Sequence, residues 1–331
     1  MIRHAICAAL SLSAALGLAP AQAAHAQAAQ ARDFPTAAEP VLEDRFPNPA
    51  VSFPGGVSAW RDVVYQTLPG YRPQIIDVYV PAGKGPHPLV LYIHGGGWMG
   101  GHTRHSGALA DFPNVLAKLA AEGFTVASLE YRLSGEARFP AQLQDANAAL
   151  RFLRGHAAQY KIDTARVGLW GGSAGGHLAA LTALTCRDTT LDPAAAQDSC
   201  VQAAVTWYGV YDFAQMAEAT AAQGPGARLL GCAGPCSPDA LRQVSPDSYI
   251  DAKDPPFLLI HGTEDKVVPV GQSRSGEAAL RKAGVPVEAI YIDGVDHSFI
   301  GKTPAQTREA TLRATNATFD FLHAKLGVPT K

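Results

Sequence analysis

The sequence predicts an α/β fold in which helices cover both faces of a mostly parallel, eight-stranded sheet. Its main support is a set of eight short runs rich in β-branched residues, at 62–66, 75–80, 89–93, 125–129, 167–170, 203–207, 257–260 and 287–292. Helical stretches separate most of the later runs, at 114–121, 141–160, 174–184, 270–283 and 304–326. Strands that alternate with helices are typical of βαβ units, whose strands lie parallel.

The start of this pattern and one interruption define the predicted domain. No helix separates the first two runs, so we expect them to form an antiparallel hairpin at the edge of the sheet. Residues 29–60 are rich in proline and lack periodicity, which indicates an irregular lead-in. Residues 211–256 contain neither a clean strand nor a long helix, and we interpret them as an insertion that forms a small cap. Residues 29–331 are therefore predicted to be one domain.

Composition excludes several classes of protein. The chain has 331 residues, of which 47% are hydrophobic and 17% charged, with a net charge of -2. A charged fraction below the usual quarter, together with an ordinary apolar fraction, excludes a disordered chain. Positive and negative residues are nearly balanced, so the composition shows no excess of basic residues of the kind that binds nucleic acid or an anionic membrane. We therefore predict neither as a partner.

Residues 1–28 have the layout of a secretory signal peptide. A short positive start at 1–4 precedes an apolar run at 5–19 and then a string of small residues. That run is short for a membrane span, so a retained anchor is the less favoured alternative and no stable span is predicted. Three cleavage positions fit equally well, after Ala23, Ala26 and Ala28. The expected location is secreted or periplasmic.

Loss of the signal peptide removes Cys7 and leaves an even set of four cysteines, Cys186, Cys200, Cys232 and Cys236. In an oxidising compartment such a set predicts two disulfides. We favour the local pairing of Cys186 with Cys200 and of Cys232 with Cys236, since each pair brackets a short polar or Gly/Pro-rich loop. Zinc binding by the second pair is the alternative, but no other Cys or His pair lies nearby in the sequence. No metal and no cofactor are predicted.

The clearest chemical signal is Gly171-Gly-Ser173-Ala-Gly175, which follows a predicted strand and opens a predicted helix. A Gly-x-Ser-x-Gly turn of this kind holds a serine in a strained conformation and exposes its hydroxyl at a helix N-terminus. Glycine is needed two positions before and after because strand and helix approach closely there. The pattern predicts Ser173 as a nucleophile. The alternative is a glycine-rich turn with an incidental serine.

A second glycine-rich loop, His94-Gly-Gly-Gly-Trp98, follows the third run. Such a loop can turn backbone N–H groups toward an oxygen that becomes negative during acyl transfer. We predict the donors of this oxyanion hole to be Gly96, Gly97 and Ala174, without deciding which N–H groups of the loop point inward. A merely flexible loop is the alternative, but it does not explain why the loop follows this strand.

The predicted acid and base lie late in the chain, each after a strand. Asp265 follows the seventh run and His297 the eighth, which gives the order Ser173, Asp265, His297. Open parallel sheets hold their active sites on loops at the carboxyl ends of the strands. His297 would accept the serine proton while Asp265 holds the imidazole. Glu264 is the competing acid, whereas Asp296 is too close in sequence to orient the adjacent ring.

Other histidines and aromatic residues near these motifs receive simpler interpretations. We assign His94, His177 and His261 to hydrogen bonds that shape the local loops. Three aromatic residues are candidate walls of a substrate pocket, Trp98, Tyr131 and Tyr208.

From about residue 60 to its end, the chain resembles secreted esterases with the α/β-hydrolase fold, close to the hormone-sensitive-lipase-like family. More narrowly, it is similar to the bifunctional feruloyl/acetyl-xylan esterase-like group of carbohydrate esterases and acetylhydrolases. The resemblance rests on six motifs, His94–Trp98, Glu130–Leu133, Phe139–Gln142 with Asp145, Gly171–His177, His261–Pro269 and Asp296–Phe299. The cysteine pairs and the Pro-rich lead-in depart from the pattern of these esterases.

The resemblance implies a serine carboxylester hydrolase that acts through an acyl-enzyme. Short acyl or aryl esters are the expected substrates, including acetyl or feruloyl esters of carbohydrates, so the expected partner is a small-molecule or carbohydrate ester. A serine peptidase of the prolyl-oligopeptidase type is one alternative, because His261-Gly-Thr-Glu-Asp265 occurs in that group as well. A non-catalytic binding protein with the same fold is the other.

Overall fold

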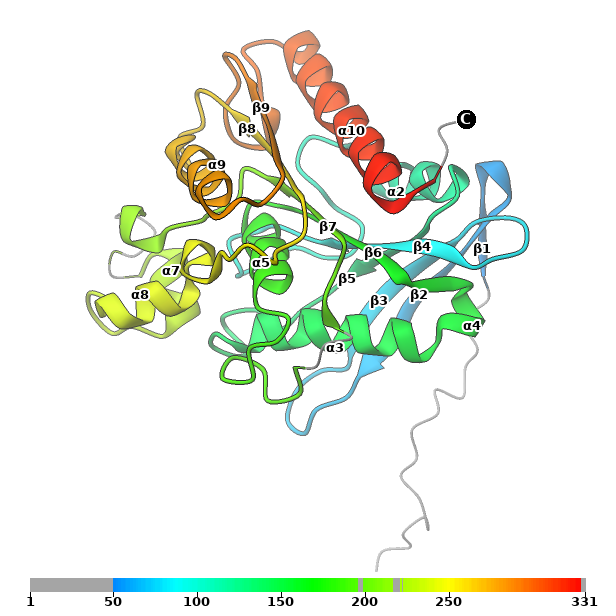
Figure 1. The fold of residues 1–331 in the computed structure, drawn as a ribbon, viewed down its shortest axis with the longest axis horizontal. Coiled ribbons are helices and arrows are strands. Elements are labelled where there is room, and N and C mark those ends of the chain that lie inside the picture. Colours follow the sequence, from blue (N-terminus) through cyan, green and yellow to red (C-terminus); the bar gives the residue numbers. More distant parts are fainter. Residues whose placement is uncertain (1–49, 196–198, 217–220, 222, 329–331) are drawn as a thin grey trace, which may run out of the picture. The chain divides into compact units, whose positions relative to one another are not determined.

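Nine strands form a single sheet in the computed structural model, which describes residues 50–195, 199–216, 221 and 223–328 (Figure 1). Along the chain the strands are β1 Val51–Phe53, β2 Val57–Gln66, β3 Gln74–Val80, β4 His87–Ile93, β5 Thr125–Leu129, β6 Ile162–Gly172, β7 Ala203–Trp207, β8 Phe257–Gly262 and β9 Val287–Ile292. Their order in the sheet is β1-β2-β3-β5-β4-β6-β7-β8-β9. Neighbouring strands from β5 through β4, β6, β7 and β8 to β9 pair in parallel. The pairs β1–β2, β2–β3 and β3–β5 are antiparallel. This arrangement confirms the predicted α/β-hydrolase fold.

The prediction of eight strands was one short, and the structure corrects the lead-in. Residues 51–53 form β1, and β2 begins at Val57 rather than at Asp62. Between them, Pro54–Gly56 forms a 3-10 turn (η1) that lets β1 fold back onto the start of β2. Proline and two glycines are typical of loops, so no local pattern indicated the strand residues on either side of them, which pair with each other. The predicted hairpin is present as the antiparallel pair β2–β3.

Helices cover both faces of the sheet (Figure 1). Their bounds are α2 Phe112–Ala121, α3 Ala141–Gly155, α4 Ala157–Tyr160, α5 Ala174–Leu184, α7 Pro225–Leu230, α8 Pro238–Val244, α9 Gly271–Ala283 and α10 Pro304–Leu326. One hydrophobic core contains side chains of α2 and α10, and the other contains side chains of α3, α5 and α9. β4 serves both cores because alternate residues point to opposite faces: Leu91 packs in one core and Tyr92 in the other.

In the part of the stretch between β7 and β8 that the structure describes, the helices are all short, as the sequence indicated. They are α7, α8 and two 3-10 helices, η3 Phe213–Gln215 and η4 Pro246–Tyr249. Figure 1 shows α7 and α8 beyond the carboxyl ends of the central strands, on the side where α5 begins. Whether this stretch acts as a cap stays a prediction.

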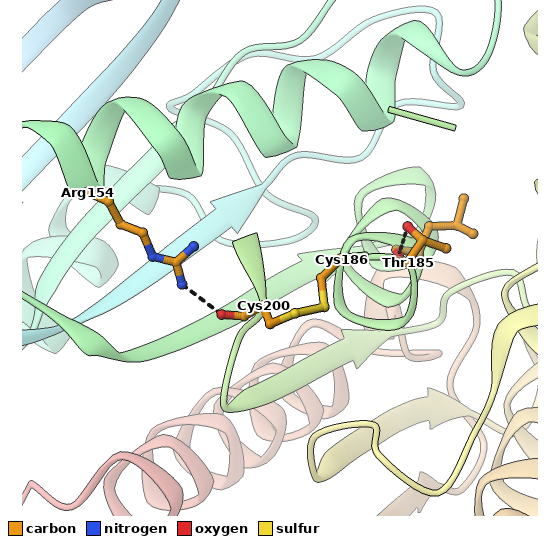
Figure 2. Close-up of a disulfide and its surroundings, with 5 residues drawn as sticks. Arg154, Thr185, Cys186 and Cys200 are labelled. Atoms are coloured by element: carbon orange, nitrogen blue, oxygen red, sulfur yellow. Dashed lines mark hydrogen bonds between the residues drawn. A yellow bond between two sulfur atoms is a disulfide. The ribbon is translucent and has the colours of Figure 1, made fainter. Parts of the chain in front are cut away.

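Two disulfides join the cysteines in the predicted local pairs. Cys186, just after α5, is bonded to Cys200, just before β7 (Figure 2). Arg154 at the end of α3 donates a hydrogen bond of 2.7 Å to the carbonyl of Cys200. Cys232 and Cys236 are bonded to each other between α7 and α8. The predicted signal peptide, 1–28, lies outside the described residues, and within the described ones no helix is long and apolar enough to cross a membrane.

Candidate active site

Ser173 occupies a sharp turn between β6 and α5. Its φ of 57° and ψ of −123° are unusual for a residue with a side chain, and its hydroxyl lies at the first turn of the helix. The two flanking glycines explain how the turn closes. A Cβ on Gly171 would come within 2.2 Å of the carbonyl oxygen of Gly175, and one on Gly175 within 2.0 Å of the carbonyl oxygen of Ile93. The predicted steric reason for glycine at both positions therefore holds.

The three residues predicted as nucleophile, base and acid are brought together. The Ser173 Oγ lies 3.0 Å from Nε2 of His297, and Nδ1 of His297 lies 2.8 Å from Oδ2 of Asp265. His297 begins the short 3-10 helix η5 (His297–Phe299) after β9, and Asp265 lies in the loop after β8. Parallel strands place these loops at one edge of the sheet although they are far apart in sequence. The ring of His297 is thus hydrogen-bonded on both of its nitrogens.

Asp265 is held as a buried carboxylate. Its Oδ1 accepts hydrogen bonds from the N–H groups of Val267 and Val268, at 2.9 and 2.8 Å. Burial alone would raise the pKa of Asp265, but hydrogen bonds from His261 and His297 outweigh that effect and hold its pKa well below the usual range. Asp265 is therefore ionised at neutral pH, as a partner of an imidazolium must be.

Sequence reasoning missed the second histidine at this carboxylate. Nε2 of His261 lies 3.2 Å from Oδ2 of Asp265 and 2.8 Å from the carbonyl of Val268, while its Nδ1 lies 2.7 Å from the hydroxyl of Ser273 on α9. The contact between His261 and the carbonyl of Val268 agrees with the predicted role of His261 in shaping the local loop. Its separation of four residues from Asp265 was the available signal for the rest.

The other nearby carboxylates make different contacts. Glu264 faces Lys302, with 3.4 Å between the charged groups, and its side chain is about half exposed. Oδ1 of Asp296 accepts hydrogen bonds from the backbone N–H groups of His297 and Lys266. Neither carboxylate contacts the imidazole of His297 in these hydrogen bonds. The geometry therefore selects Asp265 over Glu264, the alternative that the sequence had left open.

The glycine loop and the start of α5 present backbone donors beside Ser173. Gly96 and Gly97 have φ values of 112° and 60°, which glycine adopts without strain. No hydrogen bond to another described residue uses the N–H of Gly96, Gly97 or Ala174. These are the three donors predicted for an oxyanion hole, and their N–H groups are available to a ligand.

His94 and Tyr131 are buried side chains that contact the backbone of this loop. Burial lowers the pKa of His94 to about 4, so its imidazole is neutral, and Nδ1 lies 2.7 Å from the carbonyl oxygen of Gly95. Tyr131 stacks on the ring at 4.3 Å and donates a hydrogen bond to the carbonyl of His94. Tyr131 is fully buried and lines neither cavity at Ser173, so its prediction as a pocket wall was wrong.

Two cavities meet at Ser173, and Gly97 and Val267 line both of them. The first, about 460 Å³, contains His297 and is lined mainly by glycines, hydroxyl-bearing residues and His105, among them Gly107, Ser106, Ser298 and Tyr208. The second, about 360 Å³, contains Ala174 and Lys266 and is otherwise lined mainly by apolar side chains, among them Trp98, Val210, Met216 and Pro225. Trp98 and Tyr208 are thus pocket walls as predicted.

Tyr208 also fixes one side of the histidine. Its ring centroid lies 4.6 Å from that of His297 and 4.8 Å from that of Phe299. Burial raises the pKa of Tyr208, so the phenol keeps its proton. The ring packs against the imidazole without adding a charge to the site.

The profile of the BD-FAE family matches residues 76–280, which include the glycine loop, Ser173 and Asp265. The chain belongs to the BD-FAE family. This finding confirms the resemblance drawn from the motifs. His297 lies beyond the matched range, so its place in the site rests on the geometry and on its position in the sequence rather than on the family profile.

Proteins similar to this BD-FAE chain are named as esterases. Esterase LipQ of Mycobacterium tuberculosis is 31% identical over 238 residues, which are 70% of this chain and 55% of that protein. Probable carboxylic ester hydrolase LipM of the same organism is 32% identical over 220 residues, 65% of this chain and 50% of that protein. The chain spans about half the length of these curated relatives.

A solved structure of a truncated carbohydrate esterase from gut microbiota is similar over most of both chains. It is 29% identical with a TM-score of 0.69, and the match covers 81% of this chain and 96% of that one. An acetyl ester-xyloside bifunctional hydrolase from Caldicellulosiruptor lactoaceticus is 26% identical with a TM-score of 0.64, covering 77% and 91%.

Proposed function

We propose that this chain is a secreted serine esterase that hydrolyses short acyl or aryl esters, with acyl groups on carbohydrates as the substrate class. One observation carries the proposal. The Ser173 hydroxyl, the His297 imidazole and the Asp265 carboxylate form an unbroken series of hydrogen bonds at the edge of a cavity, with spacings of 3.0 and 2.8 Å. This geometry suits a serine nucleophile with its general base.

In the first half-reaction the Ser173 oxygen attacks the ester carbonyl while Nε2 of His297 takes the hydroxyl proton. The carbonyl oxygen becomes negative and accepts hydrogen bonds from the N–H of Ala174 and from the glycine loop. Asp265 holds the Nδ1–H tautomer of His297 and stabilises the imidazolium that forms. His297 then returns its proton to the alcohol oxygen, the ester C–O bond breaks, and an acyl-enzyme remains on Ser173.

In the second half-reaction a water molecule takes the position of the departed alcohol. His297 accepts a proton from this water as its oxygen attacks the acyl carbonyl. Collapse of the tetrahedral intermediate breaks the bond to Ser173, which recovers its proton from His297. The products are one alcohol and one carboxylic acid.

The carbohydrate part of the proposal is supported by similarity and by the lining of the larger cavity. The similar structures include a carbohydrate esterase and an acetyl ester-xyloside hydrolase. Exposed His105 and the hydroxyl groups of Ser106 and Ser298 line the cavity that contains His297. Hydroxyl and imidazole groups are suited to hydrogen-bond a polyhydroxy alcohol.

Secretion is proposed from the sequence of residues 1–28 together with the cysteines. The signal-like start would direct the chain out of the cytoplasm. Both cysteine pairs have the geometry of disulfides, which persist in an oxidising compartment.

The test compares Ser173→Ala with the wild type on p-nitrophenyl acetate. Removal of the nucleophile is expected to lower kcat by about five or six orders of magnitude, because residues that act as one unit fail together. Ser275→Ala on α9 is the matched control, since its hydroxyl bonds only to the carbonyl of Gln272 among the described residues.

Three further readouts separate the alternatives. A burst of p-nitrophenol equal to the enzyme concentration identifies the acyl-enzyme, and a fluorophosphonate probe should label Ser173 in the wild type. Turnover retained by Ser173→Ala contradicts the proposal. Cleavage of a prolyl amide as fast as the ester would favour a peptidase, and absence of any labelling would favour a binding protein.

A further inference from the structure

The two cavities at Ser173 differ in their relation to His297. The imidazole lines the larger cavity only, whereas Ala174 lines the smaller one only. In ester cleavage the group that leaves must receive its proton from the general acid, so the alcohol has to lie on the side of His297. The water of the second half-reaction enters from the same side. The acyl group, which stays on Ser173 throughout, must then extend into the other cavity.

Trp98 is the large fixed side chain of this smaller cavity. It is buried, and its backbone φ of 58° is unusual for a residue with a side chain. It directly follows Gly95, Gly96 and Gly97 of the glycine loop, which is also the oxyanion loop. Trp98 lines the same cavity as Ser173 and Ala174, so its ring bounds the space that is open to an acyl group on Ser173.

The indole of Trp98 is held by a buried histidine on the nucleophile helix. Its Nε1–H donates a hydrogen bond of 3.2 Å to Nδ1 of His177, and Nε2 of His177 lies 2.7 Å from the carbonyl oxygen of Val244. An indole N–H can only donate and a carbonyl can only accept, so these contacts fix the tautomer with hydrogen on Nε2. Burial lowers the pKa of His177 to about 4, which keeps Nδ1 free to accept.

The same histidine connects the pocket wall to the insertion between β7 and β8. Val244 ends α8. Phe213 of η3 packs edge-on against His177 at 5.0 Å and in a tilted arrangement against Trp98 at 5.5 Å. Pro225, the first residue of α7, lies within van der Waals distance of the position that a Cβ on Gly97 would occupy. The insertion thus completes the smaller cavity, and His177 joins it to both the helix of Ser173 and the oxyanion loop.

We propose that the smaller cavity receives the acyl group, and that His177 is a positioning residue that fixes Trp98 as the wall limiting acyl length. This inference rests on the proposed esterase function. The physical reason is that a buried indole held by a hydrogen bond cannot swing aside for a longer chain without leaving its N–H unpaired. His177 acts through Trp98 and takes no part in the proton transfers.

The experiment measures kcat/KM for p-nitrophenyl acetate, butyrate, hexanoate and octanoate in wild type, His177→Leu, His177→Gln and Trp98→Phe. With leucine the indole loses its acceptor, and the ratio of octanoate to butyrate is expected to rise about tenfold, mainly through a lower KM for octanoate. Glutamine supplies an acceptor and a donor and should restore most of the wild-type ratio. Trp98→Phe keeps a ring without an N–H and should move the ratio in the same direction as leucine.

Two controls make the result specific. Acetate esters of phenol, 4-methylumbelliferone and methanol vary the alcohol alone, and their relative rates should not change in the histidine variants. His156→Gln, which replaces an exposed histidine bonded to the carbonyl of Phe152, should leave the acyl profile unchanged. In the double variant Trp98→Phe/His177→Leu the shift should not exceed that of Trp98→Phe alone, because both changes remove one interaction.

The outcomes are distinguishable. A normal p-nitrophenol burst with an unchanged acyl profile in both His177→Leu and Trp98→Phe overturns this inference and leaves the proposed function intact. A change in alcohol preference instead of acyl preference overturns the assignment of the two cavities. Absence of both ester turnover and probe labelling of Ser173 in the wild type contradicts the proposed function and this inference with it. Should His177→Leu not fold, Trp98→Phe decides the matter.

Discussion

Asp265 determines the orientation of His297. In the sequence, Asp265 and the adjacent Glu264 were the two candidates for this role. The side chain of Asp265 is fully buried and contacts the imidazole at 2.8 Å, whereas Glu264 next to it points toward Lys302. In Asp265→Asn the amide can no longer stabilise an imidazolium, and it favours the wrong tautomer of the ring. We expect kcat for p-nitrophenyl acetate to fall by about four orders of magnitude.

Glu264→Gln is the matched control for Asp265→Asn. It removes one negative charge at the adjacent position but leaves the hydrogen bonds of His297 intact, so its kcat should stay within about twofold of the wild type, the range usual for a surface charge. A large loss in Glu264→Gln together with a small one in Asp265→Asn would contradict the geometry. Circular dichroism of both variants shows whether the fold is kept.

The residues of the site could be predicted where sequence motifs are local, and less well where contacts are distant. Ser173 follows from its glycine neighbours, and His297 from its place after the last strand. The sequence could not choose firmly between Glu264 and Asp265, because adjacent residues in a loop differ in direction only once the loop is folded. The bond from Trp98 to His177 joins positions 79 residues apart, so no local pattern announces it.

Among the elements, the turn between β6 and α5 is the most constrained. α5 is buried along its whole length and packs against the end of β4, where a Cβ on Gly175 would collide with the carbonyls of Ile93 and His94. Close approach of helix and strand at this point sets the position of Ser173 relative to the oxyanion loop. Function at the site therefore depends on packing that a single methyl group would disturb.

Gly175→Ala tests this dependence. The added methyl would lie 2.0 Å from the carbonyl oxygen of Ile93, which is a backbone atom, so backbone would have to shift to make room. We expect the free energy of unfolding to fall by about 3 kcal/mol, the upper end for overpacking, and esterase activity to fall with it. Guanidinium denaturation and p-nitrophenyl acetate turnover measure the two effects.

Gly155→Ala is the control at the level of elements. Gly155 ends α3, and nothing lies within 4 Å of the position that its Cβ would occupy. Alanine favours helix by roughly 0.5–1 kcal/mol over glycine, so this variant should be as stable as the wild type or slightly more so. Equal losses in the two variants would show that the contact of Gly175 with β4 is not the cause.

The elements themselves were predictable in proportion to their length and regularity. The eight predicted runs all became strands, because alternating β-branched residues are a strong signal and βαβ order fixes their direction. β1 was missed because three residues carry too little pattern, and β2 began early because its first residues follow Pro54-Gly55-Gly56. The first residues of β2 form a strand because they pair with β3, a contact that the local sequence does not indicate.

At the scale of the whole molecule, the two disulfides constrain different parts of the chain. The bond between Cys186 and Cys200 closes a loop between the end of the nucleophile helix and β7, with a separation of 14 residues (Figure 2). The bond between Cys232 and Cys236 spans only 4 residues and lies within the insertion. The first therefore ties the helix that follows Ser173 to strand β7 of the sheet, and the second fixes one turn.

Chain entropy predicts unequal contributions from the two bonds. Removing a cross-link frees the unfolded chain more when the closed loop is longer, by about 3 kcal/mol for a loop of this length and about 2 kcal/mol for the shorter one. We expect Cys186→Ser/Cys200→Ser to lower the free energy of unfolding by more than Cys232→Ser/Cys236→Ser, as measured by guanidinium denaturation of protein purified without reductant. Peptide mapping of the non-reduced wild type should recover both cross-linked pairs. Four free thiols in protein exported from the cytoplasm would refute both the pairing and the stability order, and equal losses in the two double variants would refute the order alone.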